Sequence, residues 1–473
     1  MAAERLRVKE AISRAQRCLE DGRARDALGL CETARKVAPH HPVLLKLGAI
    51  AAFQSGDPQK AIDLLGAAVA RYPNDAEAQY NLGVIHQAGG LMEAALANFA
   101  RAAELAPASA AGHYNKATAL HELGRVDEAI HAYRDAVAAD SNYAPAYAGL
   151  AFVLRAKGQL EEAIAAYEKA LQFDPGDSQT QTGYGVTLQH LGRLSEAAAA
   201  LRYATALDLD YSDACTNLVD VLVEQGNLNA ALAECDRYLA RHPGDSGVLA
   251  AKAIVLGESG ALQDVSRLVN LDRFLVPERQ TAPAGFADIE TFNAALSERI
   301  LSHPSLVEAP ASHATRAGKH TGELIGEASG PMATFQTMVD DAVTRYRARL
   351  GDDPTHPFVV NALSQWRLTA WSIVLQGAGG YQASHIHPSA WLSGVYYARV
   401  PAIVKDSSAG KAGWIEFGQP SKDFYWTWQP PLRAVRPEPG LLVLFPSYFF
   451  HRTIAYDLDE TRISIAFDVL PIG

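Results

Sequence analysis

The sequence predicts a multidomain chain in which an N-terminal α-solenoid precedes a β-domain of the jelly-roll type with flanking helices. Two observations support this prediction. A regular spacing of small residues runs through the first half of the 473 residues, and short segments rich in β-branched and aromatic residues follow near the end. A chain of this length also exceeds the size of one hydrophobic core, so more than one domain is expected.

Glycine and alanine mark the repeat. From Gly22 onward a glycine stands at every 34th position, and an alanine usually follows it by five residues, from Ala27 to Ala231. Units cut from Lys9 are therefore expected to hold two amphipathic helices each, with the glycine in the turn between them. A single unit cannot bury its apolar face, so neighbouring units must stack. The glycines are Gly22, Gly56, Gly90, Gly124, Gly158, Gly192, Gly226 and Gly260.

The eight in-phase units resemble the tetratricopeptide repeat family over roughly residues 9–280. The resemblance implies a superhelix whose groove binds a protein or peptide, either a substrate or a separate partner. The last unit departs from the pattern, as expected where an array meets a cap or another domain. The predicted solenoid domain therefore spans residues 1–280, and its fold alone does not identify the partner.

The residue pattern changes after the repeats. Residues 281–365 are predicted to be a linker with helices that buttress the next domain, because prolines and glycines there separate two helical patterns. From Trp366 onward, strand-like segments alternate with turn residues, so residues 366–473 are predicted to form the jelly-roll core. The strand-like segments are RLTAWSIVLQ, WLSGVYYARV, GWIEFG, LLVLFPSYFFH and TRISIAFDVL.

Composition argues against several classes of protein. The formal net charge of -11 is unfavourable for nucleic-acid binding through bulk electrostatics. The first residues lack the apolar core of a secretory signal, and no apolar run reaches the roughly 18 residues of a membrane span. The four cysteines fit neither a disulfide framework nor a zinc site. We therefore expect a cytoplasmic protein without nucleic-acid or membrane partners, with homo-oligomerisation left open.

Three histidines and one arginine form the candidate site. His385 and His387 open one strand pattern, His451 closes another, and Arg462 begins the last. Residues i and i+2 of a strand point to the same face, so His385 and His387 can both face the interior of the domain. A histidine from another strand would complete a set that holds one metal ion and leaves coordination positions open. Arg462 could pair bidentately with the far carboxylate of a dicarboxylate.

The stretches HIHPSAWLSGVYYARVP, GLLVLFPSYFFH and RISIAFDV resemble the 2-oxoglutarate/iron(II) oxygenase superfamily, and within it the group akin to aspartyl/asparaginyl β-hydroxylases. The resemblance covers roughly residues 285–473. It implies Fe(II) bound by His385 and His451, 2-oxoglutarate bound by Arg462, and O2 as a cosubstrate. It also implies Tyr396 as a further contact to 2-oxoglutarate.

One position departs from the superfamily pattern. Most members have an acidic residue where this chain has His387, although the β-hydroxylase group also lacks the acid there. Two interpretations stay open. His387 is either a third neutral ligand, or it flanks a two-histidine site whose third position is filled by water.

Other residues near these motifs are weaker candidates. Glu416 could supply a carboxylate, but its alternation with Ile415 and Phe417 favours an outward-facing position. Asp468 is expected to be a structural strand residue. The tryptophans of the β-domain could form a shelf for the substrate, but most of them are expected to pack in the core. They are Trp371, Trp391, Trp426 and Trp428.

The resemblance implies an Fe(II)/2-oxoglutarate-dependent dioxygenase, and the repeats favour hydroxylation of a protein or peptide side chain. A groove of that size would be superfluous for a small metabolite. Two alternatives are kept. One is a small-molecule oxygenase whose repeats serve oligomerisation, and the other is a non-catalytic interaction scaffold.

Overall fold

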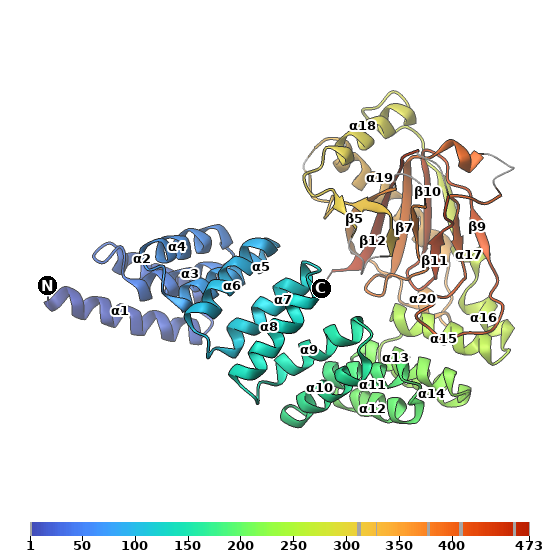
Figure 1. The fold of residues 1–473 in the computed structure, drawn as a ribbon. Coiled ribbons are helices and arrows are strands. Elements are labelled where there is room, and N and C mark those ends of the chain that lie inside the picture. Colours follow the sequence, from blue (N-terminus) through green and yellow to red (C-terminus); the bar gives the residue numbers. More distant parts are fainter. Residues whose placement is uncertain are drawn as a thin grey trace. The chain divides into compact units, whose positions relative to one another are not determined.

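The computed structural model describes residues 2–309, 314–327, 329–375, 379–405, 410–456 and 460–472. The chain divides into two compact units, residues 1–193 and residues 194–473. The first unit contains helical hairpins, whereas the second joins further helices to an antiparallel β-domain (Figure 1).

Consecutive helices of the first unit pack as hairpins. Each predicted unit holds two helices, and its marker glycine lies in the turn between them with a positive φ, as for Gly22 at 73° and Gly56 at 89°. The predicted helical repeat is therefore confirmed. The helices are α1 (Ala2–Glu20), α2 (Ala24–Arg35), α3 (Pro42–Gln54), α4 (Pro58–Arg71), α5 (Ala76–Ala88), α6 (Met92–Leu105), α7 (Ala110–Glu122), α8 (Val126–Ala139), α9 (Ala144–Ala156), α10 (Leu160–Phe173) and α11 (Ser178–His190).

The same pattern continues into the second unit. Its last hairpin is irregular, because the second helix has only 7 residues and a one-turn helix follows it. This agrees with the predicted degeneracy of the final repeat. The helices are α12 (Leu194–Leu207), α13 (Ser212–Glu224), α14 (Leu228–Leu239), α15 (Ser246–Glu258), α16 (Leu262–Leu268) and α17 (Leu271–Phe274).

Small residues allow the two helices of a hairpin to approach closely. A Cβ atom added at Gly83 on α5 would lie 2.7 Å from the ring of Phe99 on α6, so the glycine makes room for the ring. All four cysteines are buried thiols. Burial raises the pKa of Cys31 to about 11, which keeps this thiol protonated and poorly reactive.

The β-domain consists of antiparallel sheets. The largest has the strand order β1-β10-β7-β12-β5-β4-β2, and a three-stranded sheet has the order β11-β8-β9. The arrangement is consistent with the predicted jelly roll. The strands are β1 (Val276–Arg279), β2 (Val307–Glu308), β3 (Thr315–Arg316), β4 (Gly318–His320), β5 (Trp366–Leu375), β6 (Tyr381–Gln382), β7 (Leu392–Arg399), β8 (Ile415–Phe417), β9 (Arg433–Val435), β10 (Leu441–Pro446), β11 (His451–Thr453) and β12 (Arg462–Pro471).

Helices cover one face of the large sheet. Phe335 of α19 (Pro331–Leu350) packs its ring 5.7 Å from that of Tyr396 on β7 and 6.3 Å from that of Phe467 on β12. Helix α18 (Ile289–Leu301) adds Phe292 to the same layer. Because side chains alternate along a strand, the neighbours of Tyr396 and Phe467 point to the opposite face.

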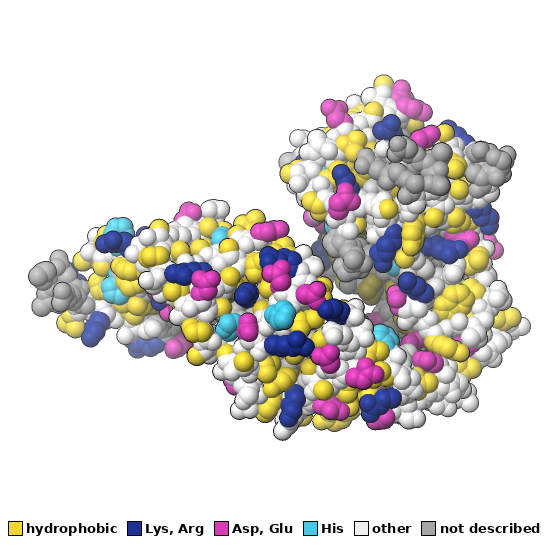
Figure 2. Space-filling view, in the orientation of Figure 1, with side chains coloured by type: hydrophobic (Ala, Val, Ile, Leu, Met, Phe, Trp, Pro, Cys, Tyr) yellow, Lys and Arg dark blue, Asp and Glu magenta, His cyan; other side chains and the backbone are white. Residues whose placement is uncertain are grey.

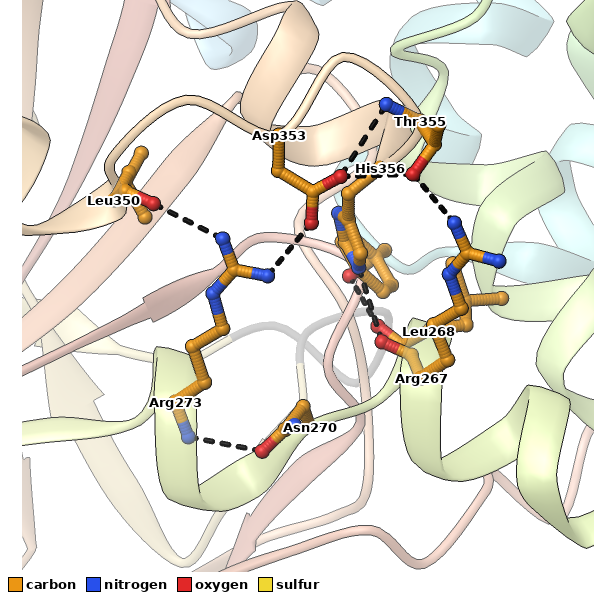
Figure 3. Close-up of polar contacts among 9 residues, drawn as sticks. Arg267, Leu268, Asn270, Arg273, Leu350, Asp353, Thr355 and His356 are labelled. Atoms are coloured by element: carbon orange, nitrogen blue, oxygen red, sulfur yellow. Dashed lines mark hydrogen bonds and ion pairs between the residues drawn. The ribbon is translucent and has the colours of Figure 1, made fainter.

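The final repeat and the β-domain form one compact unit. Arg273 of α17 forms an ion pair with Asp353, 2.8 Å between Nη1 and Oδ2, and this contact lowers the pKa of the carboxyl group (Figure 3). His356 Nε2 lies 3.1 Å from the carbonyl oxygen of Arg267 on α16. Strand β1 pairs with β10, so the predicted boundary at residue 280 follows a strand of the large sheet.

The visible surface of the repeats carries side chains of both charges. Figure 2 shows Lys and Arg interspersed with Asp and Glu over the helices that face the viewer. Within the described ranges, no helix combines the length and the apolar character that a bilayer crossing requires.

Candidate active site

The backbone brings His385 and His451 together. Their amide N–H groups donate to each other's carbonyl oxygens, both at 3.1 Å, and the two residues form an isolated antiparallel bridge. The amide of His387 donates to the carbonyl oxygen of Ser447 at 3.0 Å. Main-chain hydrogen bonds therefore hold three histidines together, although His385 and His451 are 66 positions apart in the sequence.

The three imidazole rings converge. One nitrogen of each ring lies within 4.8 Å of the corresponding nitrogens of the other two. The Nε2 atoms of His385 and His387 are 3.3 Å apart. Two imidazole nitrogens bound at about 2.1 Å to one ion, at a right angle, would lie about 3 Å apart. The rings are therefore spaced as ligands of a single ion.

Each ring has an acceptor for its other nitrogen. Nδ1 of His385 lies 2.8 Å from the carbonyl oxygen of Ala383, and Nδ1 of His451 lies 3.0 Å from that of Phe449. Both carbonyls can only accept, so Nδ1 donates and the tautomer follows from the geometry. In the neutral rings Nε2 then carries a lone pair and points toward the cluster. This orientation by outer partners is common to metal-bound histidines.

Burial keeps two of the rings neutral. It lowers the pKa of His385 to about 4, with the neighbouring His387 contributing in the same direction. Burial also lowers the pKa of His451 far below its ordinary value, and His385 and His387 add to the effect. At neutral pH both imidazoles therefore offer unprotonated nitrogen, which metal binding requires.

A carboxylate supports the third ring. Asp468 Oδ1 accepts from Nδ1 of His387 at 2.6 Å and from Oγ of Ser393 at 2.6 Å. The Ser393 and Ser447 hydroxyls are 2.8 Å apart, and Ser447 also accepts the His387 amide through its carbonyl. The chain thus has a carboxylate–histidine pair where the superfamily pattern has an acidic ligand.

Arg462 is buried beside the same cavity. Its side chain is 1% exposed, and its Nη1 donates to the carbonyl oxygen of Gly413 at 2.8 Å. The Nε–H of Arg462 and the hydroxyl group of Tyr397 are buried without a hydrogen-bond partner among the described residues. The guanidinium carbon lies 5.0 Å from the centre of the Tyr397 ring. Among the described residues no carboxylate forms an ion pair with Arg462.

One cavity joins these groups. It has a volume of about 480 Å³, and its lining includes the three histidines, Arg462 and Asp468. Apolar and aromatic side chains form much of the remaining wall. The ring of Trp371 stacks on that of His387 with centroids 5.7 Å apart. A guanidinium group without a carboxylate partner among the described residues and a set of imidazole nitrogens therefore line the same cavity, where they could receive an anion and a cation.

Two sequence predictions differ from the structure. Tyr396 does not reach this cavity: its hydroxyl donates to Oδ1 of Asn293 at 2.6 Å, on the helix-covered face. Its neighbour Tyr397 lines the cavity instead, because adjacent strand residues face opposite ways. Glu416 points away from the histidines, as predicted, but it is buried at 6% exposure and pairs with Arg452.

Asp468 is the functional candidate that sequence reasoning missed, since it was assigned only a structural role. The sequence does contain a signal for this position. Asp468 follows Arg462 by six positions on the same predicted strand, so the two side chains are expected on the same face. Of the tryptophans, Trp391 is buried in the core and Trp371 lies against the histidine cluster.

Comparison with protein families assigns both parts of the chain. Residues 369–468 match the family described as "Putative 2OG-Fe(II) oxygenase". Residues 46–110 match one tetratricopeptide repeat family, and residues 120–184, 154–202 and 188–255 match another. The chain therefore carries tetratricopeptide repeats and a domain of the 2OG-Fe(II) oxygenase family. That family implies Fe(II), 2-oxoglutarate and O2, and the narrower likeness to β-hydroxylases stays a prediction.

Three similar solved structures each match less than half of this chain. MamA from Desulfovibrio magneticus is 23% identical, with 36% of this chain and 96% of that chain covered and a TM-score of 0.34. YrrB, described as a TPR protein with an unusual peptide-binding site, is 20% identical, with 39% of this chain and 95% of YrrB covered and a TM-score of 0.35. PilF of Pseudomonas aeruginosa is 14% identical, with 45% of this chain and 96% of PilF covered and a TM-score of 0.41. No curated protein matches the sequence at a significant level.

Proposed function

We propose that this protein is an Fe(II)- and 2-oxoglutarate-dependent dioxygenase that hydroxylates a side chain of a protein or peptide. One observation supports the proposal most: a single cavity is lined by three converging imidazoles and by a buried arginine that has no anionic partner in the described part of the chain. The imidazoles suit a divalent iron ion, and the arginine suits a dicarboxylate.

We assign the metal to His385, His451 and His387. The spacing of 3.3 Å between the Nε2 atoms of His385 and His387 favours the three-histidine interpretation over a flanking role for His387. With both Nδ1 atoms donating elsewhere, the two Nε2 atoms must either share a proton in a hydrogen bond or bind the same cation, and we assign the cation. Asp468 offsets part of the positive charge through its hydrogen bond to His387.

We assign the distal carboxylate of 2-oxoglutarate to Arg462. A guanidinium group that is buried without a counter-charge is costly, and a carboxylate would offset that cost through bidentate, charge-assisted hydrogen bonds. We assign to the hydroxyl group of Tyr397 a further hydrogen bond to the same anion, since Tyr397 lines the cavity beside Arg462 and its hydroxyl meets no acceptor within hydrogen-bond distance among the described residues.

Iron and 2-oxoglutarate, when bound, supply the oxidising chemistry. In the overall balance, R–H, O2 and 2-oxoglutarate give R–OH, succinate and CO2. The residues of this chain would hold the metal and the dicarboxylate in one orientation, and Trp371 and Ile373 give the cavity part of its apolar wall. Preorganisation of this kind is the protein's contribution when a cofactor carries the chemistry.

The repeat array supports a polypeptide substrate. Stacked helical hairpins present an extended surface, and such surfaces typically bind protein or peptide segments. Polar side chains cross between repeats there, as where Nδ2 of Asn115 donates to the Tyr80 hydroxyl at 2.7 Å. The proposal is therefore that the repeats recognise the polypeptide that the β-domain hydroxylates.

Succinate formation tests this activity. Purified protein with Fe(II), O2 and 2-oxoglutarate is expected to release succinate slowly even without substrate, and His451→Ala is expected to abolish the release. Arg436→Gln serves as a control, because Arg436 pairs with Glu438 and does not line the metal cavity. Equal succinate release from the wild type and His451→Ala would contradict the proposal.

A small-molecule substrate is the second candidate. Cavities of about 480 Å³ fall within the range that holds small ligands, so the cavity volume alone allows a metabolite. Deletion of residues 1–193, the first compact unit, separates the candidates. If the repeats recognise a polypeptide substrate, that substrate should no longer stimulate succinate release by the shortened protein. If the substrate is a metabolite, it should still stimulate succinate release.

A further inference from the structure

A second cavity adjoins the metal site. Its volume is about 540 Å³, and it shares His385 and Gln382 with the first cavity. Much of its wall comes from the segment between β8 and β9, residues 418–432, which we call the β8–β9 loop. The loop residues on the cavity wall are Gln419, Pro420, Ser421, Lys422, Asp423 and Trp426.

The far end of the β8–β9 loop is held by a helix of the last repeat. Glu258, the final residue of α15, accepts hydrogen bonds from the amides of Thr427 and Trp428 through Oε1. Its Oε2 accepts from the Thr427 hydroxyl at 2.8 Å. A single carboxylate therefore binds three donors on the loop, which is a strong, charge-assisted arrangement.

A second repeat helix contributes another carboxylate. Asp220 of α13 is 7% exposed, and its Oδ1 accepts from the amide of Tyr425 at 2.6 Å. The indole ring of Trp428 also lies against α15. A Cβ atom added at Gly257 would lie 2.2 Å from that ring, so only glycine permits this packing.

The held end and the cavity wall are linked within the loop. The indole N–H of Trp426 donates to the carbonyl oxygen of Ser421 at 3.2 Å, and the hydroxyl of Ser421 donates to Asp423 at 2.8 Å. Trp426 is adjacent to Tyr425 and Thr427, which the repeat helices bind. A displacement of residues 425–428 would therefore move the wall beside His385.

We propose that the second cavity is the path by which substrate reaches the metal, and that Asp220, Gly257 and Glu258 are positioning residues that fix its wall from the repeat helices. The inference rests on the proposed function, because it concerns access to the same metal. It assigns the last two repeats a role in shaping the catalytic cavity that is independent of any partner bound by the other repeats.

Gly257→Ala is the sharpest test. Alanine favours a helix over glycine, so α15 should be retained while the added methyl group displaces Trp428. Gly66→Ala on α4 is the matched control, since a Cβ atom there meets nothing within 4 Å. Glu258→Gln is a second variant, which keeps the shape of the side chain and removes its charge.

Hydrogen exchange measures the anchoring. In Glu258→Gln the amides of Thr427 and Trp428 are expected to exchange about tenfold faster or more, because a charged acceptor is lost. In Gly257→Ala the faster exchange should extend to residues 419–426, while the amides of β10 and β12 stay protected. Unchanged exchange of residues 419–426 in both variants would overturn the proposed anchoring.

Metal extraction measures the path. With Co(II) bound, a bulky chelator should remove the ion several-fold faster from Gly257→Ala than from wild type or Gly66→Ala, at an unchanged equilibrium affinity. A loosened cavity wall should change only the extraction rate. A general loss of structure would change both the extraction rate and the equilibrium affinity for Co(II). Equal extraction rates would overturn the path alone, whereas a wild type that binds no metal would overturn the proposed function.

Discussion

Nδ1 of His387 lies 2.6 Å from Oδ1 of Asp468, so the histidine that replaces the usual acidic residue is itself bound to an acid. The carboxylate orients the imidazole and places negative charge one residue away from the proposed metal position. Ser393 donates to the same oxygen, which fixes the carboxylate in turn. If His387 is a ligand, as we propose, the protein keeps a carboxylate in the site as an outer partner of that ligand.

Replacement of Asp468 tests this role. Asp468→Asn can still accept a hydrogen bond but loses the charge, and we expect metal affinity to fall about 10- to 100-fold, as for other outer partners of metal-bound histidines. Anaerobic titration with Co(II) in competition with a chelator measures the change. Glu416→Gln is the control, because that buried carboxylate pairs with Arg452 instead. Equal losses in the two variants would show that Asp468 has no special link to the metal.

His387→Ala distinguishes the two interpretations of the metal site. If His387 is a ligand, its removal should weaken metal binding more than Asp468→Asn does, roughly 100-fold or more, because a bond to the ion is lost. The Co(II) absorption spectrum should change as well, since it depends on the ligand set. A loss of less than about tenfold with an unchanged spectrum would favour two histidines and a water.

The buried charge of Arg462 should lower the free energy of unfolding until 2-oxoglutarate binds. We expect Arg462→Gln to raise the Kd for 2-oxoglutarate about 30-fold or more, since buried charge pairs are commonly worth about 2–5 kcal/mol. The free variant should be as stable as wild type or more so, because it lacks a buried charge. Thermal melting with and without 2-oxoglutarate checks both points. A large loss of stability without ligand would indicate a structural role for Arg462.

Packing between repeats should depend on glycine at position 149. A Cβ atom at Gly149 on α9 would lie 2.4 Å from the Tyr133 ring on α8, so Gly149→Ala is expected to destabilise the protein by about 1–3 kcal/mol through overpacking. Gly66→Ala should instead be neutral or stabilising by up to about 1 kcal/mol. Urea unfolding followed by circular dichroism measures the difference, and a similar gain in both variants would contradict the packing.

The repeats could be predicted in detail because their signal is local and periodic. Gly22 and the glycines in phase with it need a positive φ in a turn, and that requirement appears in the sequence whatever the rest of the chain does. The junction with the β-domain could not be predicted. It depends on contacts between distant residues, such as Ser246 donating to the carbonyl oxygen of Ala390 at 2.8 Å.

The candidate site was predictable in part. The sequence predicts that His385 and His387 open a strand and that His451 closes one. In the structure His385 forms only an isolated bridge before β7, His387 lies outside the strands and His451 begins β11, yet the three rings converge. Whether Tyr396 or Tyr397 lines the cavity depends on which face of β7 the helices cover. The sequence motif does not contain that information. Asp468 could have been placed by alternation from Arg462, but its contact with His387 required the register of three strands.

The most direct test is anaerobic addition of Fe(II) and then 2-oxoglutarate to the purified protein, with the visible absorption spectrum recorded. We expect a weak metal-to-ligand charge-transfer band that is absent from His451→Ala and diminished in Arg462→Gln, because the ion and the dicarboxylate must bind together in one cavity. A wild-type protein that shows no band under saturating Fe(II) and 2-oxoglutarate would contradict the dioxygenase assignment and favour a non-catalytic scaffold.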